Sequence, residues 1–227
     1  MPDESGIGTL NEGSLHAALK DRYAEPGDAF EVPLEGFVID IRRSNLLVEI
    51  QTGSFGAMGR KLDRLLDEHR LLLVHPIAVH SYLQRPEGRR RRSPKKGSVY
   101  SLFDELVSLP TLLDHPGLTL DVVLVSVTKH QVADPKARRG RGGYRTTDRS
   151  LDEVFSVERF ETVDDLRRLL PDELPDHFTT ADLAELAGVS RDTAQKMAYC
   201  FRPLGVFEET GRNRAGITHR LVPPARR

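Results

Sequence analysis

Residues 36 to 53, GFVIDIRRSNLLVEIQTG, contain two short apolar strands joined by a tight turn. Side chains alternate between the two faces of a strand, so a charged residue among apolar ones is expected to face the opposite side. Asp40 has this place in the first strand and Glu49 in the second. The apolar residues expected on the other face are Phe37, Ile39 and Ile41 in the first strand, and Val48 and Ile50 in the second. The pattern predicts a β-hairpin with one acid on each strand.

The turn sets which residues of the two strands lie opposite each other. A two-residue loop at Ser44-Asn45 pairs Ile41 with Val48 and places Asp40 opposite Glu49. Directly opposed side chains have Cβ atoms about 4.5–5.5 Å apart, so the two negative charges would destabilise the hairpin without a positive partner. Hard carboxylate oxygens suit Mg²⁺ or Mn²⁺, which we expect here. The alternative is that both acids line the solvated face of a half-exposed sheet.

The segments on either side of the hairpin alternate between helix and strand patterns. Residues 11–23 are expected to form an amphipathic helix capped by Asn11, and residues 29–34 a strand. After the hairpin, residues 57–68 predict a helix and residues 70–79 a buried strand. This order of elements, with an Asp-bearing strand followed by Glu-Ile-Gln, resembles the PD-(D/E)XK nuclease superfamily over residues 11 to 80. The resemblance implies a restriction-endonuclease-like mixed α/β sheet flanked by helices.

The resemblance also implies roles for individual residues. In that superfamily an Asp, a Glu and often a Glu of the first helix hold one or two metal ions, which gives Asp40, Glu49 and Glu12. Gln51 stands where the family usually has a Lys that orients or activates water. Some restriction endonucleases of this fold carry Glu-x-Gln, and Lys61 on the next helix is a candidate for the displaced positive charge. The implied cofactor is Mg²⁺ or Mn²⁺.

Positive charge is concentrated in two stretches although the chain has a net charge of −1. Residues 85–96 and 136–149 are rich in Arg and Lys, contain Gly, Pro or Ser, and each follows an apolar strand, so we interpret them as exposed, mobile loops. Basic loops of this kind are solvated on most proteins, but beside a nuclease-like core they favour contact with a phosphate backbone. The predicted DNA-contacting residues of the loops are Arg89, Arg90, Arg91, Arg92, Lys95, Lys96, Arg138, Arg139 and Arg141.

The remaining patterns before the C-terminal region complete the first domain. Residues 98–113 predict a helix broken at Pro110, residues 120–132 and 153–161 predict strands, and residues 163–170 a short helix. His69, His75 and His80 lack the clustered spacing of a zinc site, while His16 is open to a packing or a phosphate-contacting role.

Residues 178–222 predict two helices joined by a turn and followed by two strands. Thr179 or Thr180 is expected to cap the first helix and Ser190 the second, with Gly188 in the left-handed turn between them. The segment resembles the winged helix-turn-helix of DNA-binding regulators, in which the second helix enters the major groove. Such folds also serve as protein-interaction modules. The residues expected to contact DNA are Arg191, Gln195 and Lys196 on the second helix, and Arg212 and Arg214 at the tip of the wing.

Together these features predict a nuclease-like domain at residues 1–170 and a small winged-helix domain at residues 171–227. We expect an endonuclease that hydrolyses phosphodiester bonds in DNA; the alternative is a non-catalytic DNA-binding or protein-interaction protein on a degenerate nuclease fold. A homodimer is compatible with cutting both strands. The single cysteine, Cys200, and the absence of a long apolar run or a signal peptide indicate a cytoplasmic protein without a membrane span.

Overall fold

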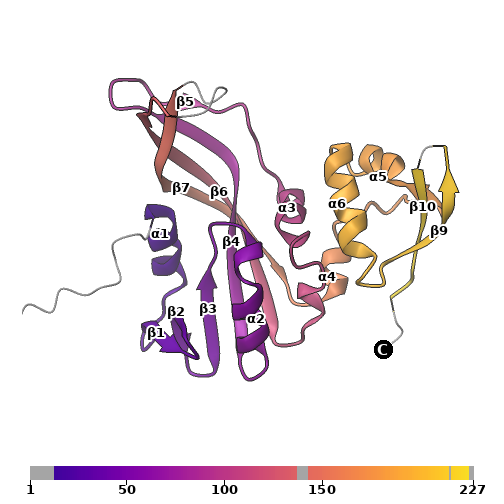
Figure 1. Cartoon of the computed structure of the whole chain (residues 1–227), viewed down its shortest axis with the longest axis horizontal. Coiled ribbons are helices and arrows are strands. Elements are labelled where there is room, and N and C mark those ends of the chain that lie inside the picture. The colour runs from indigo at the N-terminus through magenta and orange to yellow at the C-terminus, as the bar shows by residue number, and fades with distance from the viewer. Residues whose placement is uncertain (1–12, 137–142, 215, 225–227) are drawn as a thin grey trace, which may run out of the picture.

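The computed structural model describes residues 13–136, 143–214 and 216–224. These residues form a large mixed sheet flanked by helices, with a smaller three-stranded sheet and two further helices at the other end of the molecule (Figure 1). The helices are α1 (Ser14–Tyr23), α2 (Gly59–Leu66), α3 (Phe103–Leu106), α4 (Val163–Arg167), α5 (Thr180–Leu186) and α6 (Arg191–Phe201). The strands are β1 (Ala29–Leu34), β2 (Phe37–Arg43), β3 (Leu46–Ile50), β4 (Arg70–Gln84), β5 (Arg91–Arg92), β6 (Leu118–Ala133), β7 (Tyr144–Phe160), β8 (Phe178–Thr179), β9 (Phe207–Asn213) and β10 (Gly216–Leu221).

The large sheet has the strand order β1-β2-β3-β4-β6-β7, with β5 paired to β4. Strands β1, β2 and β3 are antiparallel neighbours, and α2 then returns the chain so that β4 runs parallel to β3. Strand β6 is parallel to β4, and β7 closes the sheet as an antiparallel edge. Parallel neighbours need such crossover connections, which place helices against the sheet.

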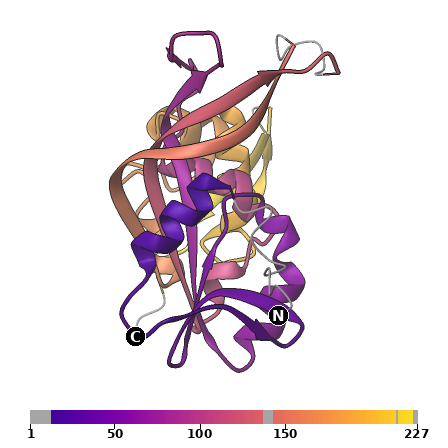
Figure 2. The same cartoon turned by 90° about the vertical axis from the view of Figure 1, so that its left-hand side faces the viewer.

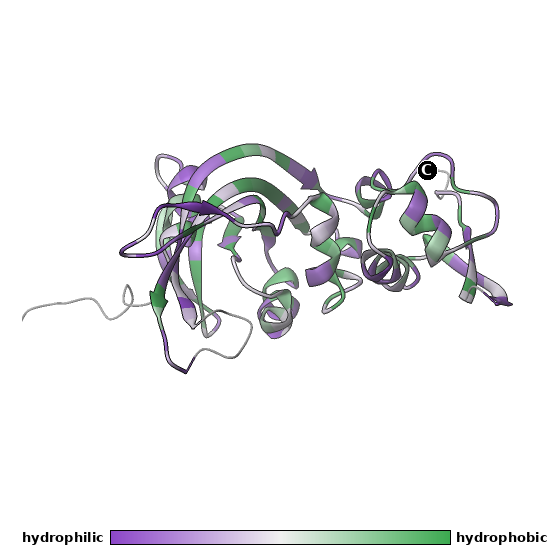
Figure 3. Ribbon diagram, turned by 90° about the horizontal axis from the view of Figure 1, so that it is seen from above, coloured by the Kyte–Doolittle hydropathy of each residue, from purple (hydrophilic) through white to green (hydrophobic). Residues whose placement is uncertain are grey.

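The central strands of the sheet are buried on both faces, and the buried residues form two clusters. On one face α1 contributes Leu15 and Leu19 to a cluster with residues of β3, β4 and β6. On the other face α2 and α3 contribute Leu62 and Phe103 to a larger cluster. Figure 2 shows α1 lying across the sheet, and Figure 3 shows apolar residues in bands along the long curved strands. The central strands are apolar on both faces because each face is covered by helices.

Strand β2 differs from the predicted alternation. Ile39 belongs to the cluster on the α2 face, whereas Ile41 belongs to the cluster on the α1 face. The expectation that Phe37, Ile39 and Ile41 share one face was therefore wrong. The strand turns its side chains between these positions, opposite Glu31, which has a positive φ of 50°. Asp40 lies at this change of face.

Three further expectations are corrected by longer strands and shorter helices. Residues 144–149, predicted as part of a mobile loop, belong to β7, which extends the predicted 153–161 strand toward its start. They pair with β6, so their backbone hydrogen bonds are used in the sheet. The helix expected over residues 98–113, with its break at Pro110, is shorter: a 3-10 helix at Val99–Leu102 runs directly into α3, and a separate 3-10 helix at Leu112–Asp114 follows Pro110. Pro110 prevents a continuous helix because it has no backbone N–H to donate.

The C-terminal part, residues 178–224, contains two helices, a turn and a hairpin. Thr179 caps α5 and Ser190 caps α6, as predicted, and Gly188 has a φ of 62° in the turn between them. Strands β9 and β10 form the hairpin, and β8 pairs with β10. Phe201 of α6 contacts Phe103 of α3 with ring centroids 5.4 Å apart. The C-terminal part therefore shares one continuous hydrophobic cluster with the large sheet.

No helix within the described ranges is long and apolar enough to cross a membrane.

Candidate functional site

The hairpin of β2 and β3 has the register that the sequence predicted. Ile41 pairs with Val48 and Arg43 with Leu46, so Ser44 and Asn45 form the two-residue loop. Ser44 has a φ of 48°. A positive φ at the first loop residue is what a type I′ or II′ hairpin turn requires. Continuing this register by one residue brings Asp40 and Glu49 to the end of the β2–β3 ladder.

Asp40 is held by two donors from different elements. The Ile50 N–H donates to Asp40 Oδ2 at 2.7 Å, and His16 Nε2 of α1 lies 3.2 Å from the same oxygen. Burial opposes ionisation, but these two hydrogen bonds and the positive charge of Lys61 leave the pKa of Asp40 below its ordinary value. Asp40 is therefore a carboxylate at neutral pH.

Glu49 has the opposite character, although it lies beside Asp40. It is 5% exposed, and burial, together with the negative charge of Asp40, raises its pKa to about 7 against the lowering effect of Lys61. Lys61 Nζ lies 2.6 Å from Glu49 Oε1 and also donates to the Val38 carbonyl at 2.7 Å. Lys61, the candidate for the displaced positive charge, therefore reaches Glu49 from α2 and bridges β2 to β3.

The Gln51 side chain is hydrogen-bonded within the loop that follows β3. Its side-chain Nε2 donates to the Ser54 carbonyl at 2.9 Å, and its own carbonyl lies 2.8 Å from His75 Nδ1. Burial lowers the pKa of His75, so the ring is neutral at pH 7 with Nδ1–H as the donor. His75 also meets the Phe55 ring edge-on. Gln51 thus stabilises the loop at the end of β3 through its side chain and its carbonyl.

His16 is the residue at this site that sequence reasoning did not assign. Its contact with Asp40 joins residues 24 positions apart, on a helix and on a strand. A spacing pattern within one element does not reveal such a pair. Glu12, which the family resemblance assigned to the site from the first helix, lies outside the described residues.

The available ligand atoms are of the chemical type that binds a divalent metal ion. Asp40 and Glu49 offer oxygens from neighbouring strands, with the Ile50 carbonyl at the end of β3, and oxygen ligands are what Mg²⁺ and Mn²⁺ prefer. Glu49 Oε1 is fully buried and has no hydrogen-bond partner of good geometry within the described chain. Such an oxygen is suited to bind a cation, but Lys61 already neutralises it. Metal binding would therefore require the ammonium to move aside.

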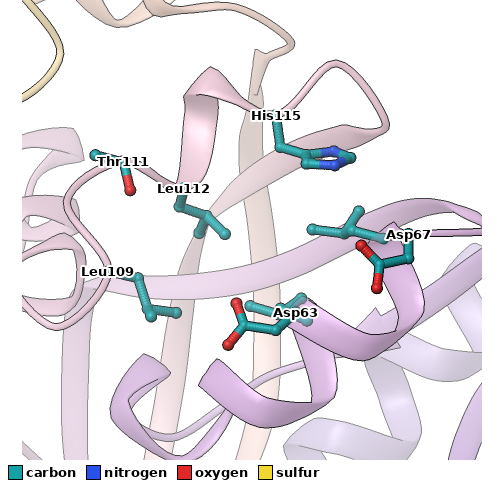
Figure 4. Close-up of a pocket in the computed structure, with 8 residues that line it drawn as sticks. Asp63, Asp67, Leu109, Thr111, Leu112 and His115 are labelled. Atoms are coloured by element: carbon teal, nitrogen blue, oxygen red, sulfur yellow. The ribbon is translucent and has the colours of Figure 1, made fainter.

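Another acidic group meets the distance criteria for a metal site. Glu35, Glu68 and His69 bring their ligand atoms within 4.8 Å of one another. Both acids are exposed, and Glu35 is paired with Arg64 at 2.7 Å. A separate hollow of about 420 Å³ is lined by Asp63 of α2, by Asp67 directly after this helix and by His115 (Figure 4). Its acids are exposed, and the His115 Nδ1 accepts from the Gly117 N–H at 3.0 Å.

The basic residues of the 85–96 stretch lie on and beside β5. Arg90 is paired with Asp152 at 2.6 Å and stacks over the Tyr82 ring, and Arg92 lies 2.9 Å from His80 Nδ1. The other predicted contact residues of this stretch are exposed: Arg89, Arg91, Lys95 and Lys96. Arg138, Arg139 and Arg141 lie outside the described residues.

On α6 the predicted contact residues do not share one environment. Arg191 and Gln195 are exposed, whereas Lys196 forms ion pairs with Asp104 of α3 at 2.8 Å and with Asp192 at 2.5 Å. The Lys196 charge is thus used between α6 and α3. Arg212 and Arg214 are exposed at the end of the β9–β10 hairpin.

These observations define a mixed α/β protein with two carboxylates, Glu49 buried and Asp40 partly buried, at the end of two sheet strands. Residues 13–161 match the model of a family described as a domain of unknown function, DUF8091. The chain is also 35% identical over 185 residues to an uncharacterized protein of Treponema pallidum (strain Nichols), a match that covers 79% of this chain and 74% of that protein. The chain belongs to the DUF8091 family. No solved structure matches it.

Proposed function

We propose that this protein is a metal-dependent nuclease of the restriction-endonuclease-like fold that hydrolyses phosphodiester bonds in DNA. The observation that carries the proposal is the convergence of Asp40 and Glu49 at the end of the β2–β3 ladder, with Lys61 beside them. The order of α1, the three antiparallel strands, α2 and the parallel strand β4 agrees with the resemblance in the sequence.

The residues around the pair have distinct roles in this proposal. Asp40 and Glu49, with the Ile50 carbonyl, would hold Mg²⁺ or Mn²⁺, which when bound lowers the pKa of water and stabilises charge on a phosphate. Asp40 is already ionised, whereas Glu49 becomes a carboxylate only as the pH rises through about 7. Lys61, displaced from Glu49, would offer its charge to the substrate phosphate. Gln51 would orient the attacking water after leaving Ser54.

The C-terminal part contributes a second contact region in this proposal. Its caps, left-handed turn and hairpin fit a winged helix-turn-helix in which α6 approaches DNA through Arg191 and Gln195. The exposed Arg212 and Arg214 would contact the backbone from the wing. Lys196 is excluded from this role while its pairs with Asp104 and Asp192 persist.

One observation favours a second candidate function, a non-catalytic DNA-binding protein. Both acids already have a partner without a metal: Lys61 for Glu49, and His16 with the Ile50 N–H for Asp40. A structural ion pair of this kind bridges strands and needs no metal ion. The two candidates differ in whether a divalent metal binds and whether DNA is cut.

The test is cleavage of plasmid and single-stranded DNA with Mg²⁺ or Mn²⁺ by the wild type, Asp40→Asn and Glu49→Gln. We expect metal-dependent cutting that falls at least about 100-fold in each variant, because each change removes a negatively charged ligand. Asp63→Asn on the exposed surface of α2 is the control and should cut like the wild type.

Two outcomes would contradict the nuclease. Equal cutting by all four proteins would indicate a contaminating enzyme. DNA binding by the wild type without cutting, and without metal binding in calorimetry, would support the non-catalytic candidate.

A further inference from the structure

A polar groove of about 540 Å³ is lined in part by His16, the residue that contacts Asp40. It is formed by the start of α1, the loop after β3, and facing segments of β6 and β7, and we call it the α1–β7 groove. Its lining includes His16, Thr52, Lys129, Thr146, Thr147 and Arg149. Hydroxyls and cations together are the groups that bind phosphate oxygens.

The groove concentrates positive charge. Lys129 and Arg149 are directly opposed on β6 and β7, and burial, together with the charges of Lys95 and Arg149, lowers the pKa of Lys129. Directly opposed like charges destabilise a sheet. Within the described part of the chain neither Lys129 nor Arg149 is ion-paired with a carboxylate; the Arg149 Nη2 donates to the Thr52 carbonyl at 3.0 Å. A bound anion would relieve this repulsion.

The acid that borders the groove is already bonded. Asp148 accepts a hydrogen bond from the Ser14 N–H at 3.0 Å, and the Ser14 hydroxyl bonds its second carboxylate oxygen. These bonds hold the pKa of Asp148 below its ordinary value. Asp148 thereby joins β7 to the start of α1, rather than pairing with Lys129 or Arg149.

His16 connects the groove to the carboxylate pair. It lines the groove, and its Nε2 lies 3.2 Å from Asp40 Oδ2. If one phosphate of a DNA strand lay in the groove, the next part of the DNA backbone would pass Asp40. The lining contains no Phe, Tyr or Trp on which a base would stack, so recognition there would be of the backbone and independent of base sequence.

We propose that the α1–β7 groove is a phosphate-binding subsite that holds a DNA strand through Lys129, Arg149 and the neighbouring threonine hydroxyls, next to the bond presented to Asp40 and Glu49. This inference rests on the proposed nuclease function for the position of the bond, but the binding itself requires no cleavage.

The experiment measures binding of the full chain to labelled single-stranded and duplex oligonucleotides, in chelator, over a range of salt concentrations. Lys129→Gln and Arg149→Gln are expected to weaken both complexes several-fold. They should also reduce the slope of log affinity against log salt by about 0.7 for single strands and about 0.9 for duplex, one phosphate contact each. Lys129→Arg, in contrast to Lys129→Gln, should retain binding because it keeps the positive charge.

Arg70→Gln, which removes an exposed charge at the start of β4, is the matched control and should bind like the wild type. Unchanged affinity and salt slope in both groove variants would overturn the proposal. Calorimetry with inorganic phosphate forms a separate arm. If Lys129→Gln loses phosphate binding but retains oligonucleotide binding, the groove binds free phosphate and the proposal is wrong.

The two proposals fail in different ways. If the groove variants lose binding while the wild type never cuts, the subsite stands and the nuclease fails. If the wild type cuts through Asp40 and Glu49 but the groove variants bind normally, the nuclease stands and the subsite fails.

Discussion

Glu49 is a nearly buried acid in an apolar sheet, and its ionisation is opposed by desolvation and by Asp40. Its pKa is raised from 4.5 to about 7, so the folded state holds this proton more tightly than the unfolded state does. The stabilisation from this group is complete below about pH 4.5 and is lost as the pH rises through about 7. A metal or an ammonium at Glu49 offsets that loss.

Removing Lys61 should move this titration upward. The Lys61 charge lowers the pKa of Glu49. In Lys61→Gln we therefore expect the midpoint of the Glu49 titration to rise by about 1 pH unit or more, as for other close ion pairs. The carboxyl signal of Glu49 in NMR titration reports the midpoint directly.

Arg60→Gln is the control for Lys61→Gln, because Arg60 is exposed on the same helix. An unchanged Glu49 midpoint in Lys61→Gln would show that the ion pair does not set the ionisation of Glu49.

The sequence allowed the positions of Asp40 and Glu49 to be predicted at the residue scale, because a two-residue turn leaves one register. Lys61 was a candidate because of its place on α2, and it does contact Glu49. His16 and Lys129 were not assigned to the site, since their neighbours come from distant elements. Contacts of this kind depend on how α1 and β7 pack on the sheet.

At the scale of the element, the turn between β2 and β3 should control the alignment of the acids. Ser44 has a φ of 48°, which a β-branched residue adopts only with strain. We expect Ser44→Val to cost about 1–2 kcal/mol of unfolding free energy and to reduce cleavage. Ser44→Gly should retain both, because glycine accepts positive φ. Urea unfolding and the plasmid assay measure the two effects.

Asn45→Val is the matched control, since Asn45 is not among the residues with positive φ. Equal losses in Ser44→Val and Asn45→Val would indicate that hydrophobic exposure, rather than turn strain, is responsible.

Element types in the first half followed from local pattern, but element lengths did not. The strand expected over residues 70–79 continues to Gln84, and the basic residues 144–149 lie within β7. Polar residues at these ends are held in strands by pairing with β6, a long-range contact that local composition does not encode.

At the scale of the molecule, the shared hydrophobic cluster should make unfolding cooperative. Phe201 is fully buried and contacts Phe103 of α3 and Phe207 of β9. Phe201→Ala should cost about 3–5 kcal/mol and destabilise both parts together. Hydrogen exchange should then rise in β6 as well as in α6.

Tyr199→Ala on the exposed side of α6 is the control and should leave the exchange rates of β6 unchanged. Loss of protection confined to the C-terminal part in Phe201→Ala would show that the two parts unfold independently.

The contact between α3 and α6 has a consequence for substrate length. If the groove and α6 both bind DNA, their separation is set by packed side chains and by the Lys196–Asp104 pair rather than by a flexible tether. The two contact regions would then lie a fixed distance apart along the DNA. A fragment too short to reach both contact regions gains nothing from the second, so affinity should rise in a single step at one oligonucleotide length.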